Sequence, residues 1–164
     1  MCSYTKILSF ISGILLVSCN EHKIKPEDFT GTLPVTADKD VTAFFEANLP
    51  PSSSSLLDCE FKFSSKTECF IIDSIDEFKD VSPKGVALPQ IDFNRYSLVI
   101  GQVVLNHGGY LFERQSIDIQ SDKVTLFVRY KELSGFYTTA FENFYFWGLY
   151  DKIPDLPFKL EIQI

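Results

Sequence analysis

The sequence predicts a mainly β fold of the α+β class, in which an antiparallel sheet forms a sandwich or a partly open barrel with one or two short helices. Two observations indicate this fold. Five segments in the second half of the chain have the apolar patterns of strands and are separated by short turns. Helical spacing of apolar residues is confined to the first half. The length of 164 residues is that of one domain.

The five strand-like segments differ in the faces that they are expected to bury. Ser97–Leu105 has valine and isoleucine on both faces, which is typical of a strand covered on both sides. Val124–Tyr130 and Phe158–Ile164 alternate apolar with polar residues, which is typical of a half-buried strand. The other two strand segments are Tyr110–Ile119 and Tyr137–Leu149.

Two segments are predicted to be helical. In Asp38–Leu49 the apolar residues at 41, 44, 45 and 49 form one stripe, and Asp38 or Asp40 can cap the first turn. Ser74 and Glu77 have the spacing of a capping box, which predicts a short helix through Lys79.

The first 19 residues resemble a bacterial lipoprotein signal peptide. A single charge, Lys6, precedes the eleven apolar or small residues Ile7–Val17, a run too short to span a membrane. Leu16–Cys19 matches the lipobox, which implies cleavage before Cys19 and acylation of that residue. We therefore expect a signal peptide at 1–18, a tether at 19–37 and a single β-rich domain at 38–164. The mature protein is expected to be lipid-anchored in the bacterial envelope.

The residue after the acylated cysteine predicts the membrane. Asn20 stands where an aspartate often retains lipoproteins at the inner membrane, so the outer membrane is the expected location. The domain would then lie in the periplasm.

Composition excludes several functions. The net charge of −7 disfavours binding to nucleic acid through phosphates. The chain has two histidines, His22 and His107, and no serine-nucleophile elbow, phosphate-binding glycine loop or zinc-ligand cluster. The sequence therefore predicts a noncatalytic protein without metal or cofactor.

Two cysteines of the exported part are expected to form a disulfide. Cys59 and Cys69 lie on two predicted strands, Leu57–Phe63 and Glu68–Asp73, which could pair about a turn at Ser64-Ser65. Export favours the oxidised form. Closure of so short a loop would contribute roughly 2.5–3 kcal/mol.

Two sequence features are candidate binding elements. The residues of Asn106–Tyr110 are consistent with two structures. One is a glycine hairpin turn with tyrosine packed beside it. The other is a loop that presents His107 and Tyr110 to a partner through Gly108 and Gly109. In Phe144–Trp147, alternation puts Tyr145 and Trp147 on one face. That face is either covered by a helix or is an exposed aromatic patch.

Residues 68–164 resemble the C-terminal domain of protease-complex-subunit PrcB-like proteins. The resemblance rests on Ile91-Asp92-Phe93, Gly108-Gly109-Tyr110 and Tyr150–Pro154 in the same order along a series of strands. Asn106-His107 stands where that family usually has a Pro-Thr pair. The resemblance implies a noncatalytic, β-rich accessory module that contacts another exported protein such as a protease. The alternative function is an envelope protein with an aromatic pocket for a sugar or a lipid.

Overall fold

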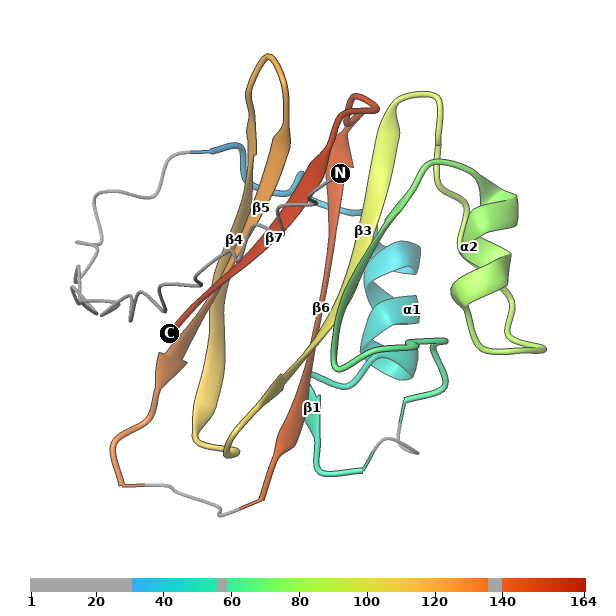
Figure 1. Ribbon diagram of the computed structural model, residues 1–164. Helices are drawn as coiled ribbons and strands as arrows, with labels where there is room; N and C mark the ends of the chain where they lie inside the picture. Colours follow the sequence, from blue (N-terminus) through green and yellow to red (C-terminus); the bar gives the residue numbers. More distant parts are fainter. Residues whose placement is uncertain (1–30, 56–58, 136–139) are drawn as a thin grey trace, which may run out of the picture.

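Two β-sheets and a layer of two helices are stacked in three layers (Figure 1). The computed structural model describes residues 31–55, 59–135 and 140–164. The predicted sandwich with few helices is confirmed. The predicted signal peptide, Cys19 and most of the predicted tether lie outside the described residues.

The four-stranded sheet is antiparallel and occupies the middle of the molecule. Its strand order is β1-β6-β3-β2. The bounds of these strands are β1 Ser52–Ser53, β6 Glu142–Asp151, β3 Tyr96–Leu105 and β2 Thr67–Ile72.

The three-stranded sheet has the order β4-β5-β7 and is mixed. Its strands are β4 Tyr110–Ile119, β5 Val124–Glu132 and β7 Phe158–Gln163. β5 pairs with β7 in parallel, so the expectation of a purely antiparallel sheet is wrong for this pair. The chain returns through β6 in the other sheet before it enters β7, and this crossover sets the direction of β7.

The predicted hairpin at Asn106–Gly109 is wrong, because β3 and β4 lie in different sheets. β3 pairs instead with β6 and β2, which cover its two edges. The turn therefore crosses from one sheet to the other. The described glycines with positive φ are Gly31, Gly85 and Gly135, so neither Gly108 nor Gly109 adopts the left-handed conformation.

Both helices form as their sequence patterns predict. α1 spans Lys39–Asn48, and its N-cap Asp38 accepts a hydrogen bond from the Val41 N–H at 2.9 Å. α2 spans Ile75–Val81, and Ser74 accepts from the Glu77 N–H at 3.2 Å. No helix within the described ranges is both long and apolar enough to cross a bilayer.

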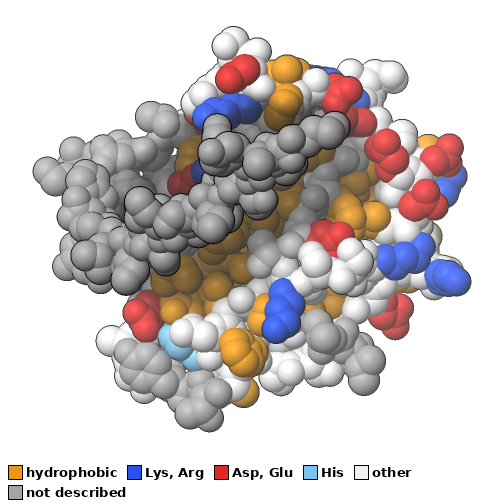
Figure 2. Space-filling model, viewed as in Figure 1, with side chains coloured by type: hydrophobic (Ala, Val, Ile, Leu, Met, Phe, Trp, Pro, Cys, Tyr) orange, Lys and Arg blue, Asp and Glu red, His pale blue; other side chains and the backbone are white. Residues whose placement is uncertain are grey.

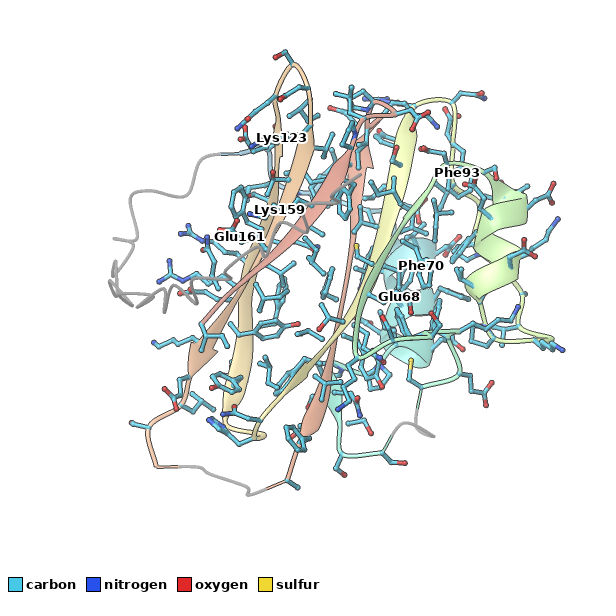
Figure 3. The ribbon with its side chains drawn as sticks, viewed as in Figure 1. Glu68, Phe70, Phe93, Lys123, Lys159 and Glu161 are labelled. Atoms are coloured by element: carbon cyan, nitrogen blue, oxygen red, sulfur yellow. The ribbon has the colours of Figure 1, made fainter. Side chains whose placement is uncertain are left out.

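The alternating faces of β6 separate two cores. Phe144, Phe146 and Tyr150 face the three-stranded sheet and fill the sandwich interior. Tyr145 and Leu149 face the helices and pack in the second core with Phe45. Figure 3 shows Phe70 and Phe93, which contribute to this second core, on the helix side of the four-stranded sheet.

The two open edges of the sandwich differ in the residues that cover them. At one edge, Thr32 exchanges backbone hydrogen bonds with Ile117 of β4, and the Val35 N–H donates to Leu149 of β6. Residues 32–35 therefore belong to the domain rather than to the predicted tether. Figure 2 shows hydrophobic side chains gathered in a hollow between the sheets on the opposite side.

The predicted disulfide is not formed, because the two sulfurs lie in different cores. Cys59 is buried with the helix-side residues, whereas Cys69 points into the sandwich interior from β2. Both are free thiols. The predicted strand at 57–63 is also wrong in its described part, 59–63, which is irregular. Burial raises the pKa of both thiols.

Candidate binding site at the edge of β6

An aromatic pocket of about 330 Å³ opens where β6 meets α1 and β4. It contains both aromatic residues that the sequence singled out on β6, Tyr145 and Trp147. We call it the edge pocket, because residues from both faces of β6 line it. The lining residues are Phe45, Glu46, Leu49, Pro51, Phe112, Tyr145, Phe146 and Trp147.

Trp147 is held by a ring on α1. Its indole stacks on Phe45 with ring centroids 4.2 Å apart and an interplanar angle of 14°. Phe45 belongs to the apolar stripe of α1 and is fully buried, so the indole has a rigid support. Of the two alternatives for the Tyr145 and Trp147 face, the helix-covered one is therefore correct. Trp147 nevertheless stays half-buried and lines the pocket.

Phe112 forms the opposite wall of the edge pocket and was not identified from the sequence. It lies at a bulge of β4, packs edge-on against Tyr130 with centroids 6.0 Å apart, and is 42% exposed. The adjacent apolar pair Leu111-Phe112 breaks the strand alternation, and this is the signal that could have indicated it.

The edge of β6 beside the pocket lacks a strand partner among the described residues. On this side, β1 pairs only with Asn143 and Phe144, and the Tyr145 N–H donates to Pro51 at 3.1 Å. The next contact is the single bridge between Val35 and Leu149. No described strand covers the stretch between these two contacts.

A glutamine takes the place of a strand at one backbone carbonyl of this stretch. The Gln115 side-chain amide of β4 donates to the Trp147 carbonyl oxygen. Gln115 is 3% exposed, and its Oε1 has no hydrogen-bond partner among the described residues. A buried acceptor without a donor is energetically unfavourable and is uncommon in folded proteins.

One acidic residue lines the edge pocket, and a second lines the groove next to it. Glu46 lines it and also lines a neighbouring groove of about 620 Å³ that contains Glu142. Glu142 accepts a hydrogen bond from the Ser52 hydroxyl at 2.6 Å. Within the described part of the chain, neither carboxylate is within salt-bridge distance of a lysine or arginine.

The Asn106–Tyr110 turn lies outside this pocket, and its residues contact one another and Glu132. Tyr110 is 8% exposed, and its ring stacks on His107 at 4.4 Å. The His107 Nδ1 accepts from the Gly109 N–H at 3.2 Å, and its Nε2 lies 3.5 Å from a Glu132 oxygen. Of the two alternatives for Tyr110, the packed position is therefore the one that the structure has, because its ring is part of the core.

One polar network around the buried residue Ser97 combines residue types that catalytic sites use. The Ser97 hydroxyl donates to Asp73 at 2.5 Å, and Lys152 pairs with the same carboxylate at 2.8 Å. Ser97 is fully buried and also accepts from the Ile153 N–H, so this network fastens the end of β6 to β2 and β3. In the described ranges no group of three or more His, Cys, Asp or Glu residues is placed to hold a metal ion.

A larger groove of about 710 Å³ lies beside α1, but its carboxylates already have backbone partners. Asp38 caps α1, and Asp92 accepts from the Asn94 N–H at 3.1 Å. The edge pocket is therefore the better candidate, because it combines exposed aromatic surface with backbone that no strand of the described ranges covers.

Comparison of this chain with protein-family models, with curated protein sequences and with solved structures finds no match.

Proposed function

We propose that the protein is an exported bacterial lipoprotein, anchored through acyl chains on Cys19, whose β-sandwich is a noncatalytic module that binds another exported protein. The lipobox supports the anchor. The observation that carries the binding role is the edge pocket, where aromatic side chains adjoin a stretch of β6 that no described strand pairs with. The resemblance to PrcB-like proteins favours a protease as the partner.

The dimensions of the edge pocket suit one large side chain of a partner. A volume of about 330 Å³ accommodates a phenylalanine, leucine or tyrosine side chain. Burial of such a side chain contributes about 1.5–3 kcal/mol. Aromatic residues in a pocket of this kind are typical of the few residues that dominate the affinity of a protein interface.

Recovery of partners from solubilised envelopes tests the proposal. The full-length lipoprotein is compared with Phe112→Ala, which removes one wall of the pocket, and with Leu111→Ala. Leu111 is adjacent, exposed and outside the pocket lining, so it is a matched control. We expect one exported protein to be recovered with the parent protein and Leu111→Ala, and to be lost with Phe112→Ala. Equal recovery with all three, or recovery of no specific protein, would contradict the proposal.

The alternative function, a site for a sugar or a lipid, is favoured by one observation. Half-buried Trp147 borders the edge pocket together with the carboxylate-bearing residue Glu46, a combination that suits a sugar ring and its hydroxyl groups. Trp147 is the single tryptophan of the chain, so its fluorescence reports on this pocket alone. Saturable quenching by a monosaccharide or a fatty acid, lost in Phe112→Ala, would support this alternative.

A further inference from the structure

We propose that the edge of β6 at Tyr145–Trp147 takes up an extended peptide segment that places a large apolar side chain in the edge pocket and a basic side chain near Glu46. This inference rests on the proposed function, because it specifies the chemistry of the partner at the same site. It is carried by three features of the described residues: backbone direction, the length of the open stretch, and charge.

Backbone direction at this edge is set by the hydrogen bonds already present. Along a strand, successive residues direct their N–H and C=O groups to opposite edges. The Tyr145 N–H, the Trp147 carbonyl and the Leu149 carbonyl are all used on the β1 side. The Trp147 N–H therefore points to the same edge, where the carbonyl of an added strand can accept from it.

The open stretch is short. Gly148 is covered, because a Cβ built there would lie 2.4 Å from Gln115 Nε2 and 3.2 Å from Pro34 Cβ. At the other end, Pro51 accepts from Tyr145. Phe146 and Trp147 lie between these two ends, a length of about 7 Å. So short a pairing supplies few hydrogen bonds, and the side chains of the peptide must supply most of the affinity.

Gln115 fits this interpretation. Its amide nitrogen donates to the Trp147 carbonyl, as the N–H of a neighbouring strand would. Its Oε1 has no partner in the described chain. The amide therefore satisfies one backbone carbonyl at this edge of β6. The other edge of β6 is paired with β3 along its whole length.

Charge distinguishes a basic segment from an acidic one. Glu46 borders both the edge pocket and the groove that contains Glu142, so a peptide side chain next to the apolar one faces carboxylates. Because neither carboxylate is in a salt bridge with a described lysine or arginine, a basic side chain gains their attraction without breaking an existing pair.

A displayed library of random nine-residue peptides tests the inference on the mature lipoprotein in detergent. We expect enriched peptides to contain a large apolar residue with lysine or arginine within two positions. We expect the tightest peptide to lose affinity about tenfold in Phe112→Ala. Charge reversal by Glu46→Lys should cost about fivefold. The exposed residue Asp122, in the turn between β4 and β5, provides the control Asp122→Lys.

Hydrogen exchange of the Trp147 amide distinguishes strand addition from binding by side chains alone. With the tightest peptide bound, we expect exchange of the Trp147 N–H to slow at least about tenfold, because the amide gains an acceptor. Unchanged exchange, enrichment of acidic peptides, or no enrichment would overturn the inference. The proposed function would stand in those cases if an envelope protein still required Phe112, and would fail separately if none did.

Discussion

Replacement of Gly101 by alanine is expected to destabilise the domain, although alanine normally stabilises a strand relative to glycine. Gly101 of β3 lies directly opposite Phe146 of β6. A Cβ built on Gly101 would lie 2.0 Å from Cζ of the Phe146 ring and 2.5 Å from its Cε2. The ring therefore lies over the glycine, and the absence of a side chain at 101 makes room for it.

The magnitude follows from two opposing terms. Replacing glycine within a strand gains about 0.5–1 kcal/mol, because the unfolded chain loses freedom. Insertion of a methyl group into a packed core costs about 1–3 kcal/mol. Phe146 is 3% exposed and packs in the sandwich core, so displacement of its ring would disturb the residues around it. We expect a net loss of about 1–2 kcal/mol in the free energy of unfolding.

Urea denaturation followed by Trp147 fluorescence measures this loss. The chain has one tryptophan, which stacks on Phe45 in the core beneath α1, so its signal reports the unfolding of the packed domain. The matched background is Phe146→Leu, which removes the ring that the new methyl group would meet. In that background the cost of Gly101→Ala should vanish or become a small gain, with a coupling energy of about 1–3 kcal/mol.

Two results would refute this reasoning. If Gly101→Ala were as stable as the parent protein, the contact with the ring would not limit packing at this position. If the substitution cost the same in both backgrounds, the cost would arise from something other than Phe146.

Four further predictions concern buried groups and a helix cap. The hydroxyls of Tyr130 and Tyr150 are buried without a hydrogen-bond partner among the described residues, so Tyr→Phe at either position should leave stability unchanged or raise it by about 1 kcal/mol; a loss above 1 kcal/mol in thermal unfolding would contradict this. Burial raises the pKa of both tyrosines. Above pH about 10 these tyrosines therefore ionise in the unfolded chain before they ionise in the folded protein, and the free energy of unfolding falls as pH rises. The Tyr→Phe variants should lose less stability between pH 9 and 12. Cys59 and Cys69 should react with iodoacetamide slowly in the native protein and rapidly in denaturant without reductant, whereas resistance until reduction would demonstrate a disulfide. Asp38→Ala should cost about 1 kcal/mol by removing the cap of α1, and Asp38→Asn should restore most of it.

Local structure could be predicted from the sequence because its causes lie within a few residues. The apolar stripe and Asp38 predict α1, and Ser74 with Glu77 predicts the start of α2. Alternation at Phe158–Ile164 predicts β7 to within one residue. In each case, residues that are neighbours in the chain make the hydrogen bonds or share the face concerned.

Pairing between strands could not be predicted in the same way. Asn106–Gly109 has the residues of a hairpin turn, yet β3 and β4 lie in different sheets. The partner of β3 was decided by β6, which is some forty residues later in the chain and apolar on both faces, so that it fits between the helices and the second sheet.

The candidate site was predicted in part. Tyr145 and Trp147 were identified from the sequence, because an aromatic cluster on a strand is visible there. Phe112 and the open edge of β6 were not, since they depend on a bulge in another sheet and on where β1 ends.

The sequence by itself determined the two helices and the extent of the main strands. Tertiary structure alone decided that Gly101 accommodates the ring of Phe146, that Cys59 and Cys69 lie in different cores, and that an aromatic pocket opens beside Trp147. The physical reason is the range of the interactions. Caps and alternation act between near neighbours, whereas a sheet edge and a pocket exist only after distant segments have packed together.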